Sequence, residues 1–255
     1  MISQLEHIEA LSLNHWPALQ TKEIDGWKLR TANGFTKRAN CVSTLLGSNE
    51  NIIEKIARCE QYYDAIEQPT IFKLTPFSEP SLDGLLDQLN YIKQDVSLVM
   101  TMPLEKFHPV TMSSLQQTDE VKFTLLHHIS IKWIEQYCKL SGTSEQLIPT
   151  IIDMMVAIQG EIVCCSCSSN NEVLAVGLAV IDNQYISLYN IITAEQHRNK
   201  GIARALITEL LNVGMQNGAH TSYIQVLSEN PSARHLYEKL GYREQYPYWY
   251  RVKND

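Results

Sequence analysis

The sequence predicts an α/β (α+β) fold in which one order of elements occurs twice along the chain. Strand, strand, helix, strand, helix, strand is the order expected over residues 27–102 and again over residues 173–251. Short runs rich in β-branched residues predict the strands, and apolar stripes at helical spacing predict the helices. The repeated order indicates a diverged duplication. We expect domains at residues 1–108 and 109–255, because prolines and polar residues cluster between Pro103 and Asp119.

The second half has the clearer pattern. A turn at residues 169–172 joins two strands into a hairpin, and Gly201 opens a helix whose apolar residues form one stripe. Asn230-Pro231 is typical of a helix start, and Gly241 stands where the end of that helix needs a left-handed residue. The expected strands are 161–168, 173–181, 185–193, 221–227 and 242–252, and the expected helices are 129–140, 144–158, 201–215 and 230–240.

Composition argues against several classes of function. The net charge of −7, from 21 basic and 28 acidic residues, disfavours broad nucleic-acid binding. Residues 1–11 lack the pattern of a signal peptide, and the longest apolar stretch, Val173–Ile181, is too short to span a membrane. We therefore expect a cytoplasmic protein with no nucleic-acid partner and no membrane partner, and the oligomeric state is left open.

The cysteines and histidines indicate no metal site. Cys164 and Cys167 form a C-x-x-C pair, but on a strand residues three apart face opposite sides. No second cysteine pair is present, and the eight histidines show no ligand spacing. We therefore expect buried, reduced thiols and no metal cofactor.

The turn Arg198-Asn199-Lys200-Gly201-Ile202-Ala203 is the strongest candidate for a binding site. It lies between a predicted strand and a predicted helix, so the free N–H groups of the first helical turn face it. The helix dipole adds positive charge there, Gly201 lets the backbone approach a ligand closely, and Arg198 and Lys200 add charge. The sequence of this turn therefore predicts a binding site for a phosphate or pyrophosphate. The alternative is an ordinary turn with two solvated basic residues.

Two motifs of the second half resemble those of the GNAT superfamily of acyl-CoA-dependent N-acetyltransferases. R-N-K-G-I-A at 198–203 fits the family pattern Q/R-x-x-G-x-G/A. N-P-S-A-R-H-L-Y-E-K-L-G-Y at 230–242 fits N-x-x-A-x-x-L-Y-x-x-x-G-F/Y, in the family's order and spacing. The resemblance covers about residues 109–255. The first half resembles the degenerate N-terminal copy of tandem GNAT proteins.

The resemblance implies two mixed, twisted sheets flanked by helices, with the C-terminal copy intact and splayed open between strands 185–193 and 221–227. Acetyl-CoA, as co-substrate, would lie in that opening. Backbone groups that would pair with its pantetheine arm belong to Ile191, Ile192 and Thr193. The N–H groups that would hold its pyrophosphate belong to Arg198, Asn199, Lys200, Gly201, Ile202 and Ala203. Asn230 would reach the pantetheine portion, and Tyr237 would lie near the sulfur.

The first half lacks the charge that such a site needs. At the position that corresponds to the phosphate turn it has residues 46–51, which carry no lysine or arginine. Glu50 in this segment would repel an anion. We therefore expect the first half to serve packing, or to frame the substrate cleft, without holding the same ligand. Its expected strands are 27–31, 40–46, 70–74 and 96–102, and its expected helices are 52–63 and 81–89.

Tyr237 is the candidate general acid for acetyl transfer. An alkyl amine with a pKa near ~10.4 must lose a proton before it attacks, and the reaction then expels a thiolate whose thiol titrates near ~8.5. A tyrosine with a pKa of ~10 is protonated at working pH and can supply the proton. A backbone N–H at the end of strand 185–193 is the expected donor to the oxyanion. Tyr237 can also be a packed aromatic side chain, and Asn230 a helix N-cap.

No general base is identified. Many GNAT enzymes carry a glutamate five residues before the motif asparagine, where this chain has Gln225. A glutamine cannot take a proton at neutral pH, although it can orient a water. Glu195 and Glu229 are nearby carboxylates, and each is also interpretable as a solvated turn residue.

The leading prediction is an acetyl-CoA-dependent N-acetyltransferase that moves the acetyl group directly to a primary amine of an unidentified small molecule or peptide. A route through an acyl-cysteine is disfavoured, because no cysteine lies within either motif. The alternatives are a catalytically silent CoA-binding regulatory or interaction module, transfer of a longer acyl group, and transfer to an alcohol. The aromatic run 246–250 is either the lining of an acceptor pocket or a sheet strand.

Overall fold

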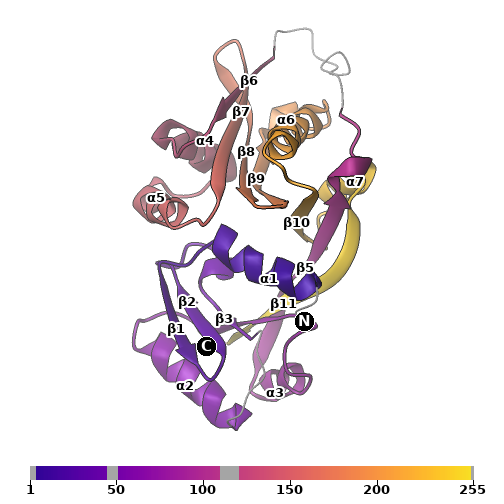
Figure 1. Cartoon of the computed structure of the whole chain (residues 1–255). Helices are drawn as coiled ribbons and strands as arrows, with labels where there is room; N and C mark the ends of the chain where they lie inside the picture. The colour runs from indigo at the N-terminus through magenta and orange to yellow at the C-terminus, as the bar shows by residue number, and fades with distance from the viewer. Residues whose placement is uncertain (1–3, 45–50, 110–120, 254–255) are drawn as a thin grey trace. The chain divides into compact units, whose positions relative to one another are not determined.

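The computed structural model of the protein describes residues 4–44, 51–109 and 121–253 (Figure 1). The chain forms two compact units that interleave along the sequence. Unit 1 comprises Met1–Val99, Val226–Pro231 and Glu244–Asp255, and unit 2 comprises Met100–Gln225 and Ser232–Arg243. The C-terminal segment thus belongs to unit 1, whereas the sequence pattern grouped it with the second half. The expected domains at 1–108 and 109–255 stay a prediction, and part of the segment between them, residues 110–120, lies outside the described residues.

Unit 1 contains a mixed sheet in the strand order β1-β2-β3-β4-β11. Only β3 and β4 pair in parallel; the other neighbours in this order are antiparallel. β5 (Tyr91–Pro103) contributes residues to both units. The remaining elements are α1 (Gln4–His15), β1 (Gln20–Ile24), β2 (Trp27–Thr31), β3 (Val42–Ser43), α2 (Ile52–Asp64), β4 (Ile71–Leu74), α3 (Leu82–Gln88) and most of β11 (Arg243–Lys253).

The predicted elements of the first half are confirmed, apart from the lengths of two strands: β5 begins at Tyr91, five residues before the expected strand 96–102. β2 and α2 match the expected strand 27–31 and helix 52–63 within a residue. The expected strand 40–46 is reduced to β3, and its residues 45 and 46 lie outside the described residues. The sequence pattern did not predict α1 or β1. One aromatic and aliphatic core joins the sheet to its helices through Ile24, Trp27, Leu29, Val42, Ile56, Cys59, Tyr63, Phe72, Leu74, Leu82, Leu86 and Tyr91.

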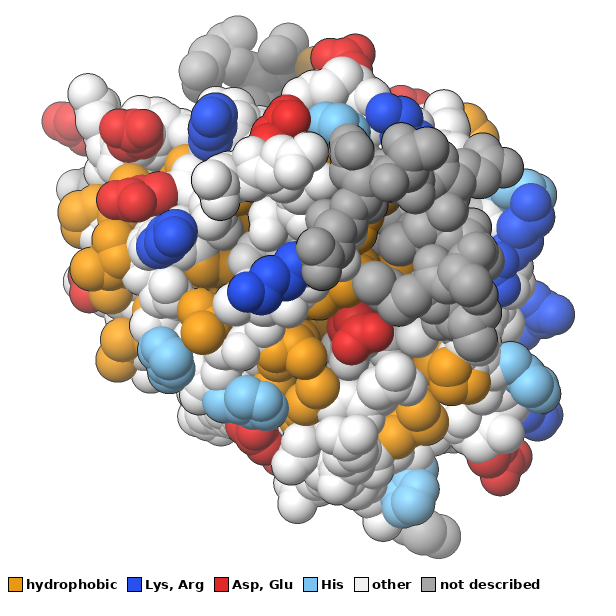
Figure 2. Space-filling view, turned by 90° about the horizontal axis from the view of Figure 1, so that it is seen from above, with side chains coloured by type: hydrophobic (Ala, Val, Ile, Leu, Met, Phe, Trp, Pro, Cys, Tyr) orange, Lys and Arg blue, Asp and Glu red, His pale blue; other side chains and the backbone are white. Residues whose placement is uncertain are grey.

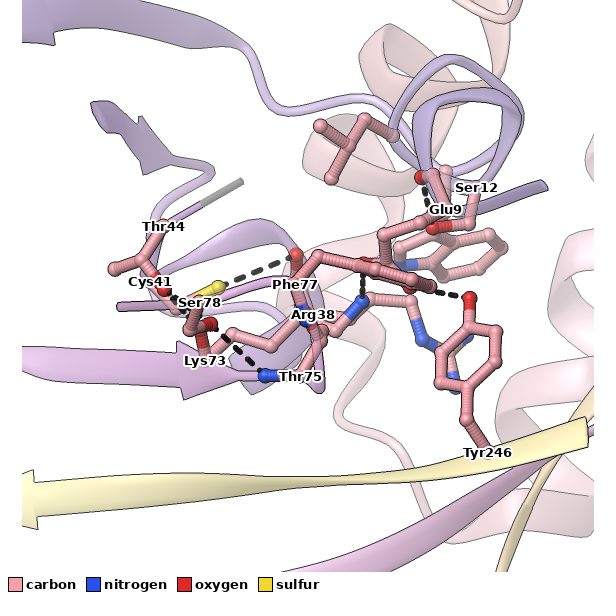
Figure 3. Close-up of polar contacts among 12 residues, drawn as sticks. Glu9, Ser12, Arg38, Cys41, Thr44, Lys73, Thr75, Phe77, Ser78 and Tyr246 are labelled. Carbon is pink, nitrogen blue, oxygen red and sulfur yellow. Dashed lines mark hydrogen bonds and ion pairs between the residues drawn. The ribbon is translucent and has the colours of Figure 1, made fainter. Parts of the chain in front are cut away.

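A buried charged cluster holds α1 to the sheet of unit 1 (Figure 3). Lys73 of β4 forms an ion pair with Glu9 of α1, and the two side chains are 1% and 0% exposed. The second carboxylate oxygen of Glu9 accepts a hydrogen bond from the Tyr246 hydroxyl at 2.9 Å. The Lys73 ammonium also lies 4.5 Å from the centroid of the Tyr248 ring. These contacts compensate the desolvation of both charges, which burial alone would make unfavourable.

In unit 2 the strands follow the order β10-β9-β8-β7-β6. All neighbours are antiparallel except β9 and β10. Helices α4 and α6 both pack against β7, β8 and β9, on opposite faces in Figure 1. The elements are β6 (Lys122–Leu126), α4 (Ile131–Ser141), α5 (Ile148–Val156), β7 (Glu161–Ser169), β8 (Glu172–Asp182), β9 (Tyr185–Thr193), α6 (Ile202–Gln216), β10 (Thr221–Leu227) and α7 (Pro231–Leu240).

The predicted elements of the second half are confirmed, with β9 and β10 matching their expected bounds. Asn170 and Asn171, in the turn between β7 and β8, both have a positive φ (49° and 65°), as a two-residue hairpin turn requires. Gly241 ends α7 with a φ of 107°. The edge strand β6 was not predicted.

Both units contain one parallel strand pair joined through a helix. In unit 1, β3 passes through α2 to β4, and in unit 2, β9 passes through α6 to β10. The second strand of each pair is followed by a shorter helix, α3 or α7. This recurrence supports the duplication that the sequence indicated.

A β-bulge lies close to the end of β9. Leu178 pairs with Tyr189 and Val176 with Ile192, so Gly177 faces two residues, Asn190 and Ile191. Asn190 takes a left-handed conformation with a φ of 52°. Gly177 leaves no room for a side chain, because a Cβ there would lie 2.5 Å from Leu206 Cδ2 of α6 and 2.7 Å from Ile191 Cδ1. The missing side chain therefore lets α6 approach the bulged end of β9.

We expect Lys73→Met to destabilise the protein by about 3–5 kcal/mol, because the substitution leaves the Glu9 carboxylate buried without its cation. The double variant Glu9→Gln/Lys73→Met removes both charges and keeps an acceptor for Tyr246. It should lose less stability than Lys73→Met alone. Urea unfolding of the three proteins measures the difference, and equal losses in the single and double variants would contradict the coupling.

We expect Gly177→Ala to destabilise the protein by about 1–3 kcal/mol, because the added methyl group must displace packed side chains of α6 and β9. Gly84→Ala is the matched control: Gly84 lies inside α3, and a Cβ added there would meet none of the described neighbouring atoms within 4 Å. Alanine at that site should be neutral or stabilising by up to about 1 kcal/mol. Chemical denaturation should therefore give the two substitutions opposite signs.

Candidate functional site

The parallel pairing of β9 and β10 covers only part of the two strands. Residues Thr221–Ile224 pair with Tyr185–Leu188, while β9 continues to Thr193 and β10 to Leu227. On its other edge, β9 remains paired with β8 as far as Thr193. The two strands thus stop pairing where the resemblance implies an opening, and the β9 edge from Tyr189 to Thr193 lies past the last pair.

The end of β9 places the expected pantetheine-binding residues on this edge. Ile191, Ile192 and Thr193 are each half-buried, and the bulge at Asn190 lies directly before them. The backbone of an extended strand edge can pair with a ligand in the manner of an added strand. The pairing of these three residues with a ligand stays a prediction.

The phosphate turn has the backbone that the sequence predicted. Asn199 and Gly201 have positive φ values of 62° and 81°, and Gly201 is the N-cap of the 15-residue helix α6. The first intrahelical bond runs from Ala205 N–H to the Gly201 carbonyl at 3.0 Å. The N-cap supplies no side-chain acceptor, and the first turn has no acidic residue. The earlier N–H groups of α6 are therefore left for an external acceptor, which the dipole makes preferentially anionic.

The side chains around the turn add positive charge at its surface. Arg198 and Asn199 are exposed, Lys200 and Ala203 are half-buried, and Ile202 is buried and anchors the helix. Basic and acidic side chains both occur on the face that Figure 2 shows. Arg198 and Lys200 thus add positive charge to this turn, although the chain as a whole carries a net charge of −7.

A polar cluster that the sequence pattern did not reveal ties the turn to the β7–β8 hairpin. The carboxylate of Glu172 accepts from Gln196 Nε2 at 3.1 Å and lies 3.4 Å from His197 Nε2. These two contacts, from Gln196 first and then His197, lower the pKa of the Glu172 carboxyl. Lys200 Nζ lies 3.5 Å from the other ring nitrogen of His197. Because the members are far apart in sequence, no spacing in the chain signals the cluster.

The corresponding helix of unit 1 begins differently. The side chain of Asn51 accepts from the N–H groups of Ile53 and Glu54, at 2.9 and 3.5 Å, and caps α2 itself. Glu54 adds negative charge to the first turn. Residues 46–50 of the segment compared above lie outside the described residues. The capped start of α2 supports the prediction that only the second copy binds an anion.

Tyr237 lies on α7 with its ring buried. It is 9% exposed, and its ring packs edge-on against Tyr242 at a centroid distance of 5.6 Å. Burial raises the pKa of Tyr237 to about 12, so its hydroxyl stays protonated throughout the physiological range. The packed-aromatic interpretation of its ring is therefore correct, and the catalytic role of its hydroxyl stays a prediction.

Asn230 directly precedes α7, as the Asn-Pro pair predicted. It is exposed, and its N–H donates to the Leu227 carbonyl at 3.1 Å, closing a turn after β10. Pro231 begins the helix. The contact of Asn230 with pantetheine stays a prediction.

Two half-buried residues at the ends of β9 and β10 have side-chain polar atoms that are buried without a partner among the described residues. Gln225 is the first residue of β10 past the last pair, and neither its Oε1 nor its Nε2 makes a hydrogen bond. The Oγ1 of Thr193, the last residue of β9, is in the same condition. By contrast, the two carboxylates considered as bases, Glu195 and Glu229, are exposed. Their interpretation as solvated turn residues fits this exposure.

The aromatic run at residues 246–250 is a sheet strand of unit 1. Tyr246, Tyr248 and Tyr250 are buried in β11, which pairs antiparallel with β4. The indole N–H of Trp249 donates to Asp83 of α3 at 2.9 Å. The strand interpretation is therefore correct for these residues.

All six cysteines are free and buried. Burial raises the pKa of Cys59, Cys164 and Cys167 to about 12, which keeps these thiols protonated and unreactive. Among the described residues, no three His, Cys, Asp or Glu side chains lie close enough together to bind a metal ion. Within the same part of the chain, no helix combines the length and apolarity needed to cross a membrane.

Comparison with known proteins agrees with this geometry. Residues 2–251 match the family model described as "Probable histone acetyltransferase Rv0428c C-terminal". The chain is also 28% identical over 252 residues to YobR of Bacillus subtilis (strain 168), an uncharacterized N-acetyltransferase, with 99% of this chain and 100% of the relative covered.

Solved structures share the fold at low sequence identity. A GCN5-related N-acetyltransferase from Kribbella flavida superposes with a TM-score of 0.75 at 10% identity, over 100% of this chain and 97% of the other. A tandem GNAT protein from the clavulanic acid biosynthesis pathway gives a TM-score of 0.62 at 9% identity, over 82% and 72% of the two chains. The chain belongs to the Rv0428c C-terminal acetyltransferase family and is an acyltransferase with the GNAT fold, which a tandem GNAT protein shares.

Proposed function

We propose that the protein transfers an acetyl group from acetyl-CoA directly to a primary amine of a small molecule or peptide. The observation that carries this proposal is the start of α6, where a glycine N-cap leaves the first N–H groups without a side-chain acceptor beside Arg198 and Lys200. A pyrophosphate satisfies both features, because it accepts several N–H bonds and carries negative charge. Family membership supports acetyl-CoA as the donor.

The second copy holds the co-substrate in this proposal. Backbone N–H groups of residues 198–203 bind the pyrophosphate, and the edge at Ile191, Ile192 and Thr193 pairs with the pantetheine arm. Asn230 contributes a polar contact to the same arm. The resulting extended conformation directs the thioester toward the end of β9, where a backbone N–H donates to the oxyanion.

Tyr237 donates a hydrogen bond to the leaving sulfur. Its pKa of about 12 guarantees a protonated hydroxyl. Full proton transfer to a thiolate whose thiol titrates near ~8.5 is uphill by roughly 3–4 pKa units. Tyr237 therefore stabilises the developing charge, and solvent supplies the proton that completes the free thiol.

Direct transfer is favoured over a covalent acyl-cysteine. Every cysteine is buried, and the thiols with a raised pKa are poor nucleophiles at neutral pH. A catalytically silent CoA-binding module is the second candidate, and Gln225, which cannot act as a base, is the observation that favours it. Acetyl-CoA binding without thiol release across a panel of amines would select that candidate.

We expect Gly201→Asp to weaken CoA binding at least about tenfold, as measured by isothermal titration calorimetry. A carboxylate at this N-cap would accept the free N–H groups of α6 itself and repel the pyrophosphate. Gly218→Asp is the control, since Gly218 has a φ of 83° against 81° for Gly201 and follows the other end of the same helix. Equal affinities of the two variants would remove the phosphate turn from the proposal.

We expect Tyr237→Phe to lower kcat about 10- to 100-fold with little change in the KM for acetyl-CoA, because the lost hydrogen bond forms mainly in the transition state. The wild-type rate should show no loss from Tyr237 ionisation below about pH 11, since a raised pKa preserves the protonated form to higher pH.

Tyr242→Phe is the control for this substitution. It removes the hydroxyl that bonds Ser222 at 2.6 Å and should lower stability by about 1 kcal/mol while kcat is kept. An unchanged kcat in Tyr237→Phe would disprove the role of its hydroxyl.

A further inference from the structure

The side-chain amide of Gln225, on β10, lacks the hydrogen-bond partners that buried amides in folded proteins normally have. Both of its polar atoms are buried, and neither makes a hydrogen bond among the described residues. A buried amide in this condition raises the free energy of the folded protein. A ligand that forms hydrogen bonds with the Gln225 amide during function would compensate this cost. An unpaired buried polar group calls for such an explanation, because most buried polar groups in folded proteins are hydrogen-bonded.

The register of β10 shows on which face of the sheet Gln225 lies. Ile224 forms the last pair with Leu188, so Gln225 is the first β10 residue freed from that ladder. Side chains two apart on a strand share a face, which places Gln225 on the same face as Tyr223. The Tyr223 hydroxyl lies 3.4 Å from that of Tyr189 of β9. Gln225 thus lies directly past the last pair, where the edge of β9 that the proposed function gives to the co-substrate begins.

We propose that Gln225 is a specificity-determining residue that hydrogen-bonds the acceptor amine, directly or through one water, and selects amines that are already neutral: α-amino groups of amino-acid derivatives or peptides. This inference rests on the proposed function. A carboxamide oxygen accepts an N–H from the amine and leaves the nitrogen lone pair for attack on the thioester carbonyl. It takes up no proton, so the acceptor must reach the site in its neutral form or be deprotonated by solvent.

Because Gln225 takes up no proton, the pKa of the acceptor amine decides which amines can react. An α-amino group titrates near ~7.7–8.0, so roughly one molecule in eight is neutral at pH 7. A lysine-type alkyl amine titrates near ~10.4, and only about one in 2,500 is neutral. The neutral fraction therefore favours the α-amine about 300-fold, and its lower intrinsic nucleophilicity offsets part of this advantage.

The two carboxylates considered above as general bases do not change the expected preference for neutral amines. Glu195 and Glu229 are both exposed, as solvated turn residues are, and neither shares the buried setting of Gln225. Of the other polar residues that the proposed function uses, Thr193 has a neutral hydroxyl and Tyr237 a protonated one. Both can donate or accept hydrogen bonds, but neither takes a proton from an ammonium group near neutral pH.

The test measures kcat/KM from pH 6 to pH 10.5 by thiol release from acetyl-CoA, with the full chain and two acceptors of similar size. Alanine amide supplies an α-amine and n-butylamine an alkyl amine, while an alanyl dipeptide distinguishes a peptide N-terminus from a free amino-acid derivative. With wild-type protein, the rate should level off near the pKa of each acceptor. Alanine amide should exceed butylamine at least tenfold at pH 7.

Substitutions at Gln225 separate its chemistry from its packing. Gln225→Glu introduces a base and should raise the rate with butylamine at pH 7 at least tenfold relative to alanine amide. Gln225→Met has similar volume without polar atoms, so it should raise the unfolding midpoint yet lower kcat/KM at least tenfold for both acceptors. Gln216→Glu, at the exposed end of α6, makes the same charge change and should alter neither rate.

The outcomes distinguish this inference from the proposed function. Transfer with one apparent pKa for both acceptors, or a preference for butylamine at pH 7, would overturn the role of Gln225 and leave acetyl transfer intact. Full activity of a stably folded Gln225→Met would do the same. Acetyl-CoA binding without transfer to any of the three acceptors would overturn both.

Discussion

The arrangement of unit 2 depends on the limited pairing between β9 and β10. A parallel ladder that ran the full length of both strands would satisfy all backbone groups on that edge within the protein. Here the ladder ends at Leu188 and Ile224, and the bulge at Asn190 bends the rest of β9. The edge from Tyr189 to Thr193 consequently offers backbone groups to an extended ligand, and the buried amide atoms of Gln225 belong to the first β10 residue past the last pair.

Packing of α6 fixes where this strand end points. Gly177 and Gly214 leave no room for side chains against Leu206, Ile191 and Ile186, so helix and sheet meet closely along their contact. The positive φ of Gly201 then turns the chain into α6 with its first N–H groups uncapped. Rigid packing behind the turn and free donors in front of it are the conditions under which a helix start can bind an anion repeatedly in one geometry.

The two β–α–β units differ at the start of their helices. In unit 1 the side chain of Asn51 occupies the donors of α2, and Glu54 lies in its first turn. The buried charges of unit 1 instead stabilise its structure: Glu9, Lys73 and Tyr246 join α1, β4 and β11 (Figure 3). The two helix starts thus differ in the feature on which the proposed anion site depends: Asn51 caps α2 with its side chain, whereas Gly201 leaves the first N–H groups of α6 without a side-chain acceptor.

Most elements, and the turn at residues 198–203 between β9 and α6, could be predicted from the sequence, because they depend on local periodicity, glycine conformation and capping chemistry. The spacing of the two motifs likewise indicated the superfamily before any contact was known. Helix α1 is recognised only in the tertiary structure, because its buried Glu9 pairs with Lys73 of β4, which lies 64 positions away in the sequence. The edge strands β1 and β6 lack a clear apolar alternation, because four of the five residues of β1 are exposed and β6 has no buried residue. The place of β11 in unit 1, the end of the β9–β10 ladder and the unpartnered burial of Gln225 also arise from pairing between distant segments, which no local pattern encodes.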